Sequence, residues 1–349
     1  MSKKLTGAEI VLKSLLDHGV EIVFGYPGGA VLPIYDSLFK QNSIRHVLVR
    51  QEAGAIHAAE GYARSSGKVG VVLVTSGPGA TNVVTGLTDA MMDSIPIVCI
   101  TGQVPQHLIG SDAFQECDTT GITRPCTKHN YLVKDANKLS EVLHEAFKIA
   151  NNGRPGPVLV DIPKDVQFAQ GNYLEVDKIN IKKHRLFEPR IKGNEENIEE
   201  ACKIISNAKK PIFYIGGGCI NSGPKASELV RNFVTETGAP ATMTLMGLGV
   251  LPSSNQFSLG MLGMHGMYEA NLAMHECDVM INIGARFDDR VTGRLDAFSP
   301  NSKKIHIDID ASNINKNIKV DIPIVGDVES IMNQIEKSWK KNNYSTNKD

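Results

Sequence analysis

The chain has 349 residues, of which 42% are hydrophobic and 21% are charged, and this composition is typical of a folded globular protein. The length is sufficient for two domains, each with a core of its own. The formal net charge of −1 provides no basic field for nucleic acid, and no apolar run approaches the roughly 20 residues of a membrane span. The amino-terminal stretch lacks the pattern of a signal or transit peptide. We therefore expect a cytoplasmic protein without a nucleic-acid or membrane partner.

Cysteine and histidine spacing points to no disulfide framework and to no metal site. The six cysteines contain no Cys-x-x-Cys pair, and several lie within apolar runs, where a reduced thiol behaves as a small hydrophobic group. The ten histidines include no His-x-x-x-His or His-Glu-x-x-His spacing. We expect six reduced cysteines, and we assign no metal ligand in this chain.

The first half of the chain alternates apolar runs with segments that favour helices, which is typical of a doubly wound parallel α/β sheet. The first 16 residues favour an amphipathic helix, and residues 137–151 favour another. Between strands, residues 104–130 form a polar stretch that is too long for an ordinary βα loop, and such loops tend to hold function. Five strands are expected, beginning near residues 22, 46, 69, 95 and 158, so that a first domain covers residues 1–168.

Three features lie where these strands are expected to end. A Pro-Gly-Gly turn follows the first strand at Gly25–Gly29, Glu52 lies in the first turn of a helix, and a Gly-rich turn covers Ser76–Asn82. Ligands of open α/β sheets bind at this edge. Each feature also has an ordinary explanation, since a tight turn connects a strand to a helix and an acid complements the helix dipole.

The second half repeats the α/β pattern after a change in composition. Residues 169–195 are polar and basic without a clear period, and we interpret them as a linker. Residues 196–342 then form a second doubly wound domain, with helices expected at 195–208, 224–238, 267–275 and 328–341, strands at 211–219, 241–247, 278–290, 304–310 and 322–328, and a Gly- and Met-rich loop at 259–267. Glycine-rich turns at its strand ends suit a nucleotide cofactor, although ordinary βα connections would show the same residues.

Taken together, these motifs resemble the catalytic subunits of acetolactate synthase (acetohydroxyacid synthase), in the thiamine-diphosphate enzyme family. The resemblance extends from residue 4 to about residue 340. Its motifs are GYPGGAVLPIYD (25–36), RQEAGAIHAAEGYAR (50–64), TSGPGATN (75–82), GQVP (102–105), SDAFQE (111–116), RPGPVLVDIPKD (154–165), GMHG (263–266) and GARFDDRVTG (284–293).

The resemblance implies a division of cofactors among domains. In that family the first domain binds the aminopyrimidine of thiamine diphosphate, the central Rossmann-like domain binds FAD, and a third domain holds the diphosphate through Mg²⁺. The third domain carries a Gly-Asp-Gly motif, which this sequence does not contain. We therefore expect the diphosphate-binding domain and its Mg²⁺ ligands to be missing, with residues 343–349 as the start of the linker toward them.

The implied reaction is the decarboxylation of pyruvate and the ligation of the product to a second 2-keto acid. With pyruvate or 2-oxobutanoate as acceptor, it gives 2-acetolactate or 2-aceto-2-hydroxybutanoate, in the first common step of valine, leucine and isoleucine biosynthesis. The family implies a homodimer or homotetramer and a possible regulatory small subunit. Two alternatives stay open: a chain that binds FAD and dimerises but is catalytically incomplete, and a sister thiamine-dependent decarboxylase or oxidase.

The resemblance also implies roles for individual residues. Three of these residues also have an ordinary interpretation: Lys164 as a solvated strand-end lysine, Arg290 as an ion-pair partner of Asp288 or Asp289, and His265 as a packing residue. The catalytic set is Glu52, Phe114, Gln115, Lys164 and Arg290, and the thiamine-diphosphate set is Gly29, Glu52, Pro78 and Asn82. The FAD set is Arg154, Gly216, Gly217, Gly218, Thr244, Leu245, Met246, Leu262, Gly263, Met264, His265, Gly284, Ala285, Arg286, Asp308, Ile309, Gly326 and Asp327.

Overall fold

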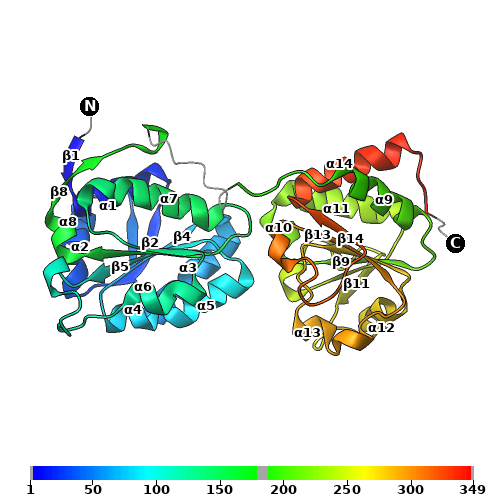
Figure 1. Ribbon diagram of the computed structural model, residues 1–349, viewed down its shortest axis with the longest axis horizontal. Helices are drawn as coiled ribbons and strands as arrows, with labels where there is room; N and C mark the ends of the chain where they lie inside the picture. The colour runs from blue at the N-terminus through cyan, green and yellow to red at the C-terminus, as the bar shows by residue number, and fades with distance from the viewer. Residues whose placement is uncertain (1–2, 179–187, 347–349) are drawn as a thin grey trace. The chain divides into compact units, whose positions relative to one another are not determined.

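The computed structural model describes residues 3–178 and 188–346, which divide into two compact units, residues 1–187 and 188–349. Each unit contains a six-stranded parallel sheet with helices on both faces (Figure 1). This is the α/β architecture that the alternating apolar pattern predicted. Among the described residues, no helix combines the length and the apolar character that crossing a membrane requires.

The first sheet has the strand order β3-β2-β4-β5-β7-β6. Its central strands β4, β5 and β7 are buried along their whole length. Strands that are covered on both faces are expected to appear as apolar runs, and these do so except at Thr101, Gln103 and Asp161. The strands are β2 (Ile22–Tyr26), β3 (Arg45–Leu48), β4 (Gly70–Val74), β5 (Ile97–Gln103), β6 (His129–Leu132) and β7 (Pro157–Pro163).

Two cores cover the two faces of this sheet. One core packs α1, α2 and α7 against the strands, and the other packs α3 and α5 against the opposite face (Figure 1). The helices are α1 (Gly7–Asp17), α2 (Leu32–Phe39), α3 (Glu52–Ser66), α4 (Pro78–Asn82), α5 (Val84–Asp93), α6 (Thr119–Thr123), α7 (Leu139–Asn151) and α8 (Lys164–Phe168). Pro33 lies in the first turn of α2, where a missing N–H costs least.

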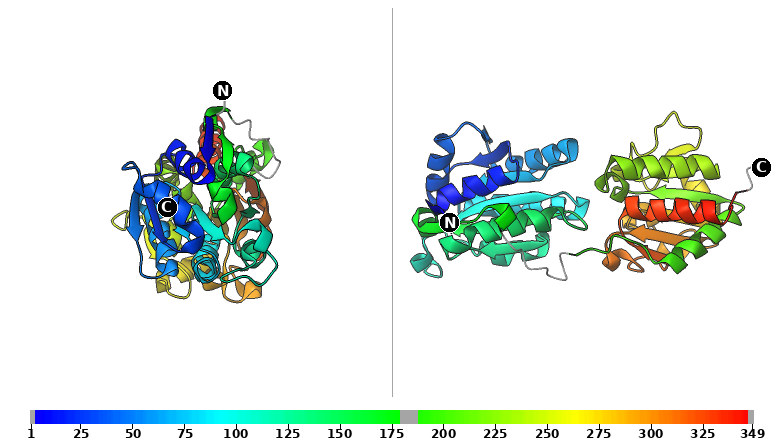
Figure 2. Two further views of the ribbon diagram at one scale, coloured as in Figure 1. Left: turned by 90° about the vertical axis from the view of Figure 1, so that its left-hand side faces the viewer. Right: turned by 90° about the horizontal axis from the view of Figure 1, so that it is seen from above.

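The second sheet has the order β11-β10-β9-β12-β13-β14. Helix α14 packs between α9 and α11 on one face, as the right-hand view of Figure 2 shows, and α12 packs on the other face. The strands are β9 (Pro211–Ile215), β10 (Ala241–Met243), β11 (Ser258–Met261), β12 (Val279–Ile283), β13 (Lys303–Asp308) and β14 (Ile322–Val325). The helices are α9 (Glu195–Ser206), α10 (Gly218–Asn221), α11 (Pro224–Thr237), α12 (Tyr268–Glu276), α13 (Asp289–Thr292) and α14 (Val328–Lys341).

Four short strands differ from the sequence-based expectation. Residues 3–6, expected in a helix, form β1 (Lys3–Thr6), which pairs antiparallel with β8 (Gln170–Tyr173), a segment expected in the linker. Strands β6 and β11 occupy segments that were expected to be loops, so the first sheet has six strands instead of five. All four lie at sheet edges or in a two-stranded ribbon, where partial exposure removes the continuous apolar run that marks a buried strand. Residues 179–187 of the expected linker and the last three residues of the expected segment 343–349 lie outside the described residues.

Candidate functional site

The carboxyl edge of the first sheet is open where β2 and β4 lie side by side. The chain passes from β2 to β3 on one side and then to β4 on the other, and ligands of doubly wound sheets bind at such a reversal. The turn after β2 contacts the end of β4 directly, since the Ala30 N–H donates to Thr75 Oγ1 at 3.3 Å. A Cβ on Gly28 would lie 2.5 Å from the Cβ of Thr75, so only glycine allows this approach.

Glu52 lies at this edge as the first residue of α3. Its Oε2 accepts a hydrogen bond of 2.8 Å from Asn82 Nδ2, and its side chain is half-buried. The preceding residue, Gln51, is the N-cap and accepts from the Ala53 N–H at 2.8 Å. Glu52 is therefore not the residue that caps the helix, and two motifs separated by 30 residues meet at its carboxylate.

The long polar segment after β5 folds back onto the same edge. Gly77 has a φ of +55°, and a Cβ there would lie 2.6 Å from the carbonyl oxygen of Gln115. The Glu116 carboxylate accepts from the backbone N–H groups of Gly110 and Ala113, and these bonds lower the pKa of Glu116. Phe114 is 88% exposed. The structure thus brings Gln115 to the turn that leads into Pro78 and leaves the ring of Phe114 in the open.

A buried polar network, which the sequence did not indicate, anchors this segment. Asp161 in β7 is 1% exposed and accepts hydrogen bonds from Thr101 Oγ1 at 2.7 Å and from Gln103 Nε2 at 2.9 Å. The same amide donates to the Cys117 carbonyl at 2.8 Å. Burial raises the pKa of Asp161 to about 7, against the lowering effect of the two donors. The network connects the sheet interior to the segment that carries Gln115.

Two proposed substrate residues follow strand ends but show different surroundings. Lys164 begins α8 directly after β7 and is half-buried. Arg290 lies in the second unit, where its Nη2 is 2.8 Å from Asp289 Oδ2 and its N–H donates to Asp288, the N-cap of α13. The ion pair considered as an alternative for Arg290 is therefore present in the structure.

In the second unit, the expected FAD positions follow the carboxyl ends of all six strands. The turns after β9 and β12 lie where the strand order reverses, and their backbones are in close contact. A Cβ on Gly216 would lie 2.2 Å from the Gly284 carbonyl oxygen, and a Cβ on Gly218 would lie 2.7 Å from Gly284 Cα. Gly284 has a φ of +65°. These contacts leave no room for side chains where the two turns meet, and the backbone N–H groups of Gly216 and Gly218 donate to the carbonyl oxygens of Ile283 and Gly284. Gly-rich turns at the carboxyl ends of parallel strands are a common setting for a phosphate-bearing cofactor.

The other expected FAD residues around these turns differ in their exposure. Asp308 at the end of β13 is buried and accepts from the Asp310 N–H at 2.8 Å. Leu245 and Met264 expose 70% and 65% of their surface beside the turns after β10 and β11. His265 is exposed, so it does not pack in the interior. Arg154 belongs to the first unit, where its Nε donates to Ser94 Oγ at 2.8 Å.

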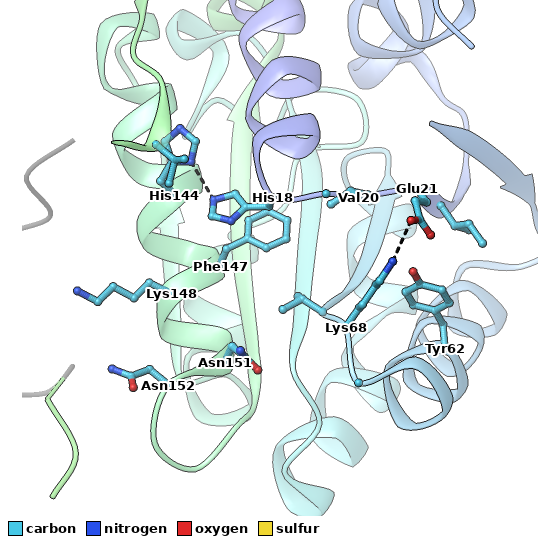
Figure 3. A pocket seen from close by; sticks show the side chains of 15 residues that line it. His18, Val20, Glu21, Tyr62, Lys68, His144, Phe147, Lys148, Asn151 and Asn152 are labelled. Atoms are coloured by element: carbon cyan, nitrogen blue, oxygen red, sulfur yellow. Dashed lines mark hydrogen bonds and ion pairs between the residues drawn. The ribbon is translucent and has the colours of Figure 1, made fainter. Parts of the chain in front are cut away.

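A separate pocket of about 600 Å³ lies at the opposite, amino-terminal edge of the first sheet (Figure 3). His18 stacks on Phe147 in its wall with the ring centroids 4.2 Å apart, and burial lowers the pKa of His18 to about 4. Gly67, after the end of α3, lines the pocket, whereas Glu52 begins the same 15-residue helix. At 1.5 Å per residue the two ends are about 22 Å apart, so this pocket is not part of the Glu52 site.

Comparisons with known proteins identify both units. The family described as "Thiamine pyrophosphate enzyme, N-terminal TPP binding domain" matches residues 5–122, and "Thiamine pyrophosphate enzyme, central domain" matches residues 198–335. The chain is 52% identical over 339 residues to the acetolactate synthase large subunit of Haemophilus influenzae, a match that covers 95% of this chain and 57% of that protein.

Further relatives give the same result. The acetolactate synthase isozyme 3 large subunit of Escherichia coli is 49% identical over 333 residues, covering 95% of this chain and 57% of its own length. The large subunit of Corynebacterium glutamicum is 49% identical over 344 residues, covering 99% and 54% respectively. The chain thus spans somewhat more than half the length of these relatives. It belongs to the thiamine pyrophosphate enzyme family, and its two units correspond to the N-terminal and central domains of acetolactate synthase large subunits.

Proposed function

We propose that this chain provides the pyrimidine-binding part of a thiamine-diphosphate site for acetolactate synthesis, with Glu52 as its activating acid. The observation that carries the proposal is the Glu52–Asn82 contact at the reversal of strand order. Glu52 is a half-buried carboxylate that an amide orients at the carboxyl edge of the sheet. Such a carboxylate can share a proton with a ring nitrogen of a bound ligand. The identity of about half the residues with acetolactate synthase large subunits supports the assignment over a sister decarboxylase or oxidase.

When bound, thiamine diphosphate supplies a nucleophilic carbon and an electron sink for the decarboxylation of a 2-keto acid. The role of Glu52 is to hold a proton at the ring nitrogen N1′ of the pyrimidine. Asn82 donates to Oε2 and fixes the orientation of the carboxylate, while Oε1 receives no hydrogen bond from any described residue. Gly29 is exposed, and a Cβ there would meet no atom within 4 Å, so the backbone beside this carboxylate is open to a ring.

The remaining residues of the proposed site contribute to substrate recognition. Lys164 offers a cation for the carboxylate of pyruvate, and Gln115 and Phe114 lie on the segment that packs on Gly77. We assign Arg290 to the carboxylate of the second 2-keto acid, since a guanidinium can hold a carboxylate with two hydrogen bonds. This role requires Arg290 to exchange its exposed ion pair with Asp289 for the substrate.

The second unit is assigned to FAD, with Gly216–Gly218 and Gly284 cradling its diphosphate and Asp308 facing its ribose. We assign neither the diphosphate of thiamine nor its Mg²⁺ to residues of this chain. A homodimer or homotetramer in the cytoplasm, associated with a regulatory small subunit, completes the proposal.

The test measures acetolactate formed from pyruvate by the 349-residue chain with thiamine diphosphate, Mg²⁺ and FAD. The assay is run with and without a second polypeptide, which contains the part of the E. coli relative beyond the matched region. We expect activity in the complemented mixture and a loss of roughly 10²-fold or more in Glu52→Gln. Glu21→Gln, which changes an exposed acid, serves as the control. Full activity in the Glu52 variant would exclude the assigned role.

A second candidate function is a flavin-binding chain without activity of its own. It is favoured by the close approach of the turns at Gly216 and Gly284, which bears on flavin binding alone. If this candidate is right, the chain keeps its FAD absorbance after gel filtration, and no acetolactate forms with or without the second polypeptide. Formation of acetolactate by the complemented mixture excludes it.

A further inference from the structure

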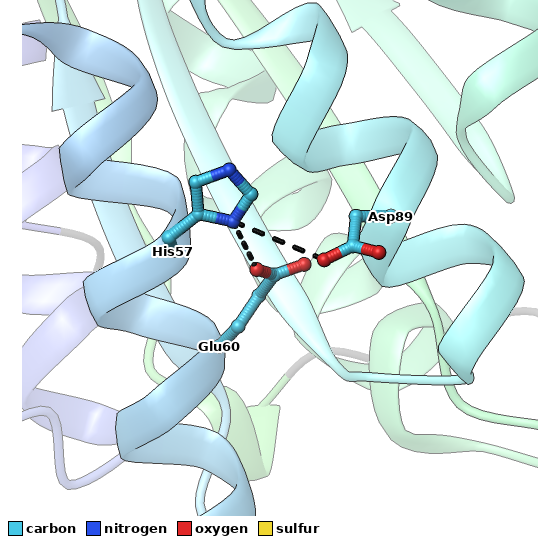
Figure 4. A group of neighbouring side chains, drawn as sticks. All are labelled: His57, Glu60 and Asp89. Carbon is cyan, nitrogen blue, oxygen red and sulfur yellow. Dashed lines mark hydrogen bonds and ion pairs between the residues drawn. The ribbon is translucent and has the colours of Figure 1, made fainter. Parts of the chain in front are cut away.

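Three side chains from two neighbouring helices converge on the outer surface of the first unit (Figure 4). His57 and Glu60 are three residues apart on α3 and therefore share a face of that helix. Asp89 comes from α5, which packs against α3 in the same core. One nitrogen or oxygen atom of each side chain lies within 4.8 Å of the corresponding atoms of the other two.

The separations suit ligands of a common ion. His57 Nδ1 is 2.7 Å from Glu60 Oε2 and 3.9 Å from Asp89 Oδ2. A cation with bonds of about 2.0–2.2 Å in a tetrahedral site holds its ligand atoms about 3.3–3.6 Å apart. The two observed distances lie on either side of that value, so side-chain adjustments without backbone movement would bring the atoms into place.

The burial of Glu60 is a second observation, independent of the ligand spacing, that points to a bound cation. Its side chain is only 7% exposed, and its Oε1 is buried without a hydrogen-bond partner among the described residues. Figure 4 shows the Glu60 carboxylate between His57 and Asp89, with its second oxygen toward Asp89. The Glu60 carboxylate lies close to a second carboxylate, that of Asp89, and its hydrogen bond to His57 uses only one of its two oxygens. A buried, unpaired carboxylate oxygen is costly and rare in native structures.

We propose that His57, Glu60 and Asp89 bind a divalent transition-metal cation, for which Zn²⁺ is the best match. An imidazole nitrogen with two carboxylates suits zinc, whereas Mg²⁺ and Ca²⁺ prefer oxygen ligands alone. The side chains of His57 and Asp89 are 49% and 50% exposed, which leaves an entry path and a fourth position for water. Without the cation, a proton lies between His57 Nδ1 and Glu60 Oε2 in their hydrogen bond, and the bound cation displaces this proton.

This site is separate from the proposed thiamine site. It uses neither Glu52 nor Asn82, and its three ligands join α3 to α5 farther along both helices. A cation that binds only the folded state stabilises it in proportion to the logarithm of the free cation concentration. Binding is therefore measurable without any enzyme assay, and its failure would not touch the proposed function.

The experiment titrates Zn²⁺ into metal-free 349-residue protein by calorimetry at neutral pH. All proteins carry Cys117→Ser, because Cys117 is the one cysteine that is not fully buried and thiolates bind zinc. We expect one equivalent to bind, with affinity lowered roughly tenfold or more in His57→Gln and in Asp89→Asn. His275→Gln and Asp36→Asn, at exposed positions elsewhere on helices, are the matched controls and should bind like the parent.

A second measurement separates ligand loss from misfolding. Thermal melting without metal should be similar in the parent, His57→Gln and Asp89→Asn, because both side chains are half-exposed, and Zn²⁺ should raise the melting temperature of the parent only. Visible absorption after addition of Co²⁺ provides a spectroscopic signature of ordered ligation that the two variants should lose. Absence of zinc binding in the parent, or equal binding in parent and both variants, overturns the proposal.

Discussion

Asp161 connects the interior of the first sheet to the segment that carries Gln115, and it provides the sharpest test of the energetics. We predict that Asp161→Asn removes a pH dependence from the stability of the first unit. The asparagine can keep both hydrogen bonds, with its oxygen toward Gln103 Nε2 and its amide toward Thr101, whose hydroxyl can turn to accept. The substitution therefore removes the ionisation while preserving shape.

The expected magnitude follows from the pKa of this carboxyl, which is about 7 in the folded chain against an ordinary value of 3.8. Between these values the folded state binds a proton that the unfolded state has released, so stability falls as pH rises through this window. The full difference corresponds to about 4 kcal/mol at 1.36 kcal/mol per pKa unit. From pH 5 to pH 7 the loss amounts to about 2 kcal/mol, because the carboxyl is already half-ionised at the upper end.

The assay is urea unfolding at several pH values from 5 to 7, followed by circular dichroism. The single tryptophan, Trp339, lies in the core of the second unit, so its fluorescence reports that unit separately. The difference in unfolding free energy between parent and Asp161→Asn should change by about 2 kcal/mol over this range. Asp36→Asn, the same substitution at an exposed site, should show no such change. A parent-to-variant difference that stays constant with pH would refute the reasoning.

Three further predictions concern packing. Gly86→Ala would place a Cβ 2.1 Å from Ile56 Cγ2 and should lower the free energy of unfolding by about 1–3 kcal/mol. Gly61→Ala, whose Cβ would meet no atom within 4 Å, should instead stabilise α3 by about 1 kcal/mol. Urea unfolding measures both effects. Gly216→Ala should abolish flavin retention in gel filtration, because its Cβ would meet the Gly284 carbonyl oxygen, and retained flavin would show that this contact is not required. A thiol reagent should modify one cysteine of six in the native chain, Cys117, and all six in denaturant, as peptide mapping would reveal.

The parts of the fold that were predictable are those in which burial dictates the sequence. Strands β4, β5 and β7 are mainly apolar because both faces are covered, and the helices between them carry one apolar face. The strands that the pattern did not reveal are short and partly exposed. The pairing of β1 with β8 joins residues more than 160 positions apart, and no local periodicity indicates such a contact.

The candidate site shows the same division between local and long-range information. The strand pattern placed the segments of Glu52 and Asn82 at one edge of the sheet, because parallel strands bring their carboxyl ends together, and the family resemblance implied their roles. The role of Asp161 was not predicted, because a carboxylate inside an apolar run shows nothing of the Gln103 amide that holds it from another strand. In the same way His57 and Glu60 are recognisable as neighbours on one helix, but Asp89 joins them only through the packing of α3 on α5.

The two proposed ligand sites depend on different groups, and this difference determines how each would fail. In the first unit the turns pack through Gly28 and Gly77, but the proposed chemistry depends on a side chain, Glu52, which Asn82 orients. Replacing Glu52 by glutamine leaves that packing intact and removes only a proton-holding group. In the second unit the edge consists of backbone, because Gly216 and Gly284 touch without room for a Cβ. A methyl group there displaces main chain. We therefore expect the proposed flavin binding of the second unit to fail through a change of shape, and the proposed role of Glu52 in the first unit to fail through a change of charge.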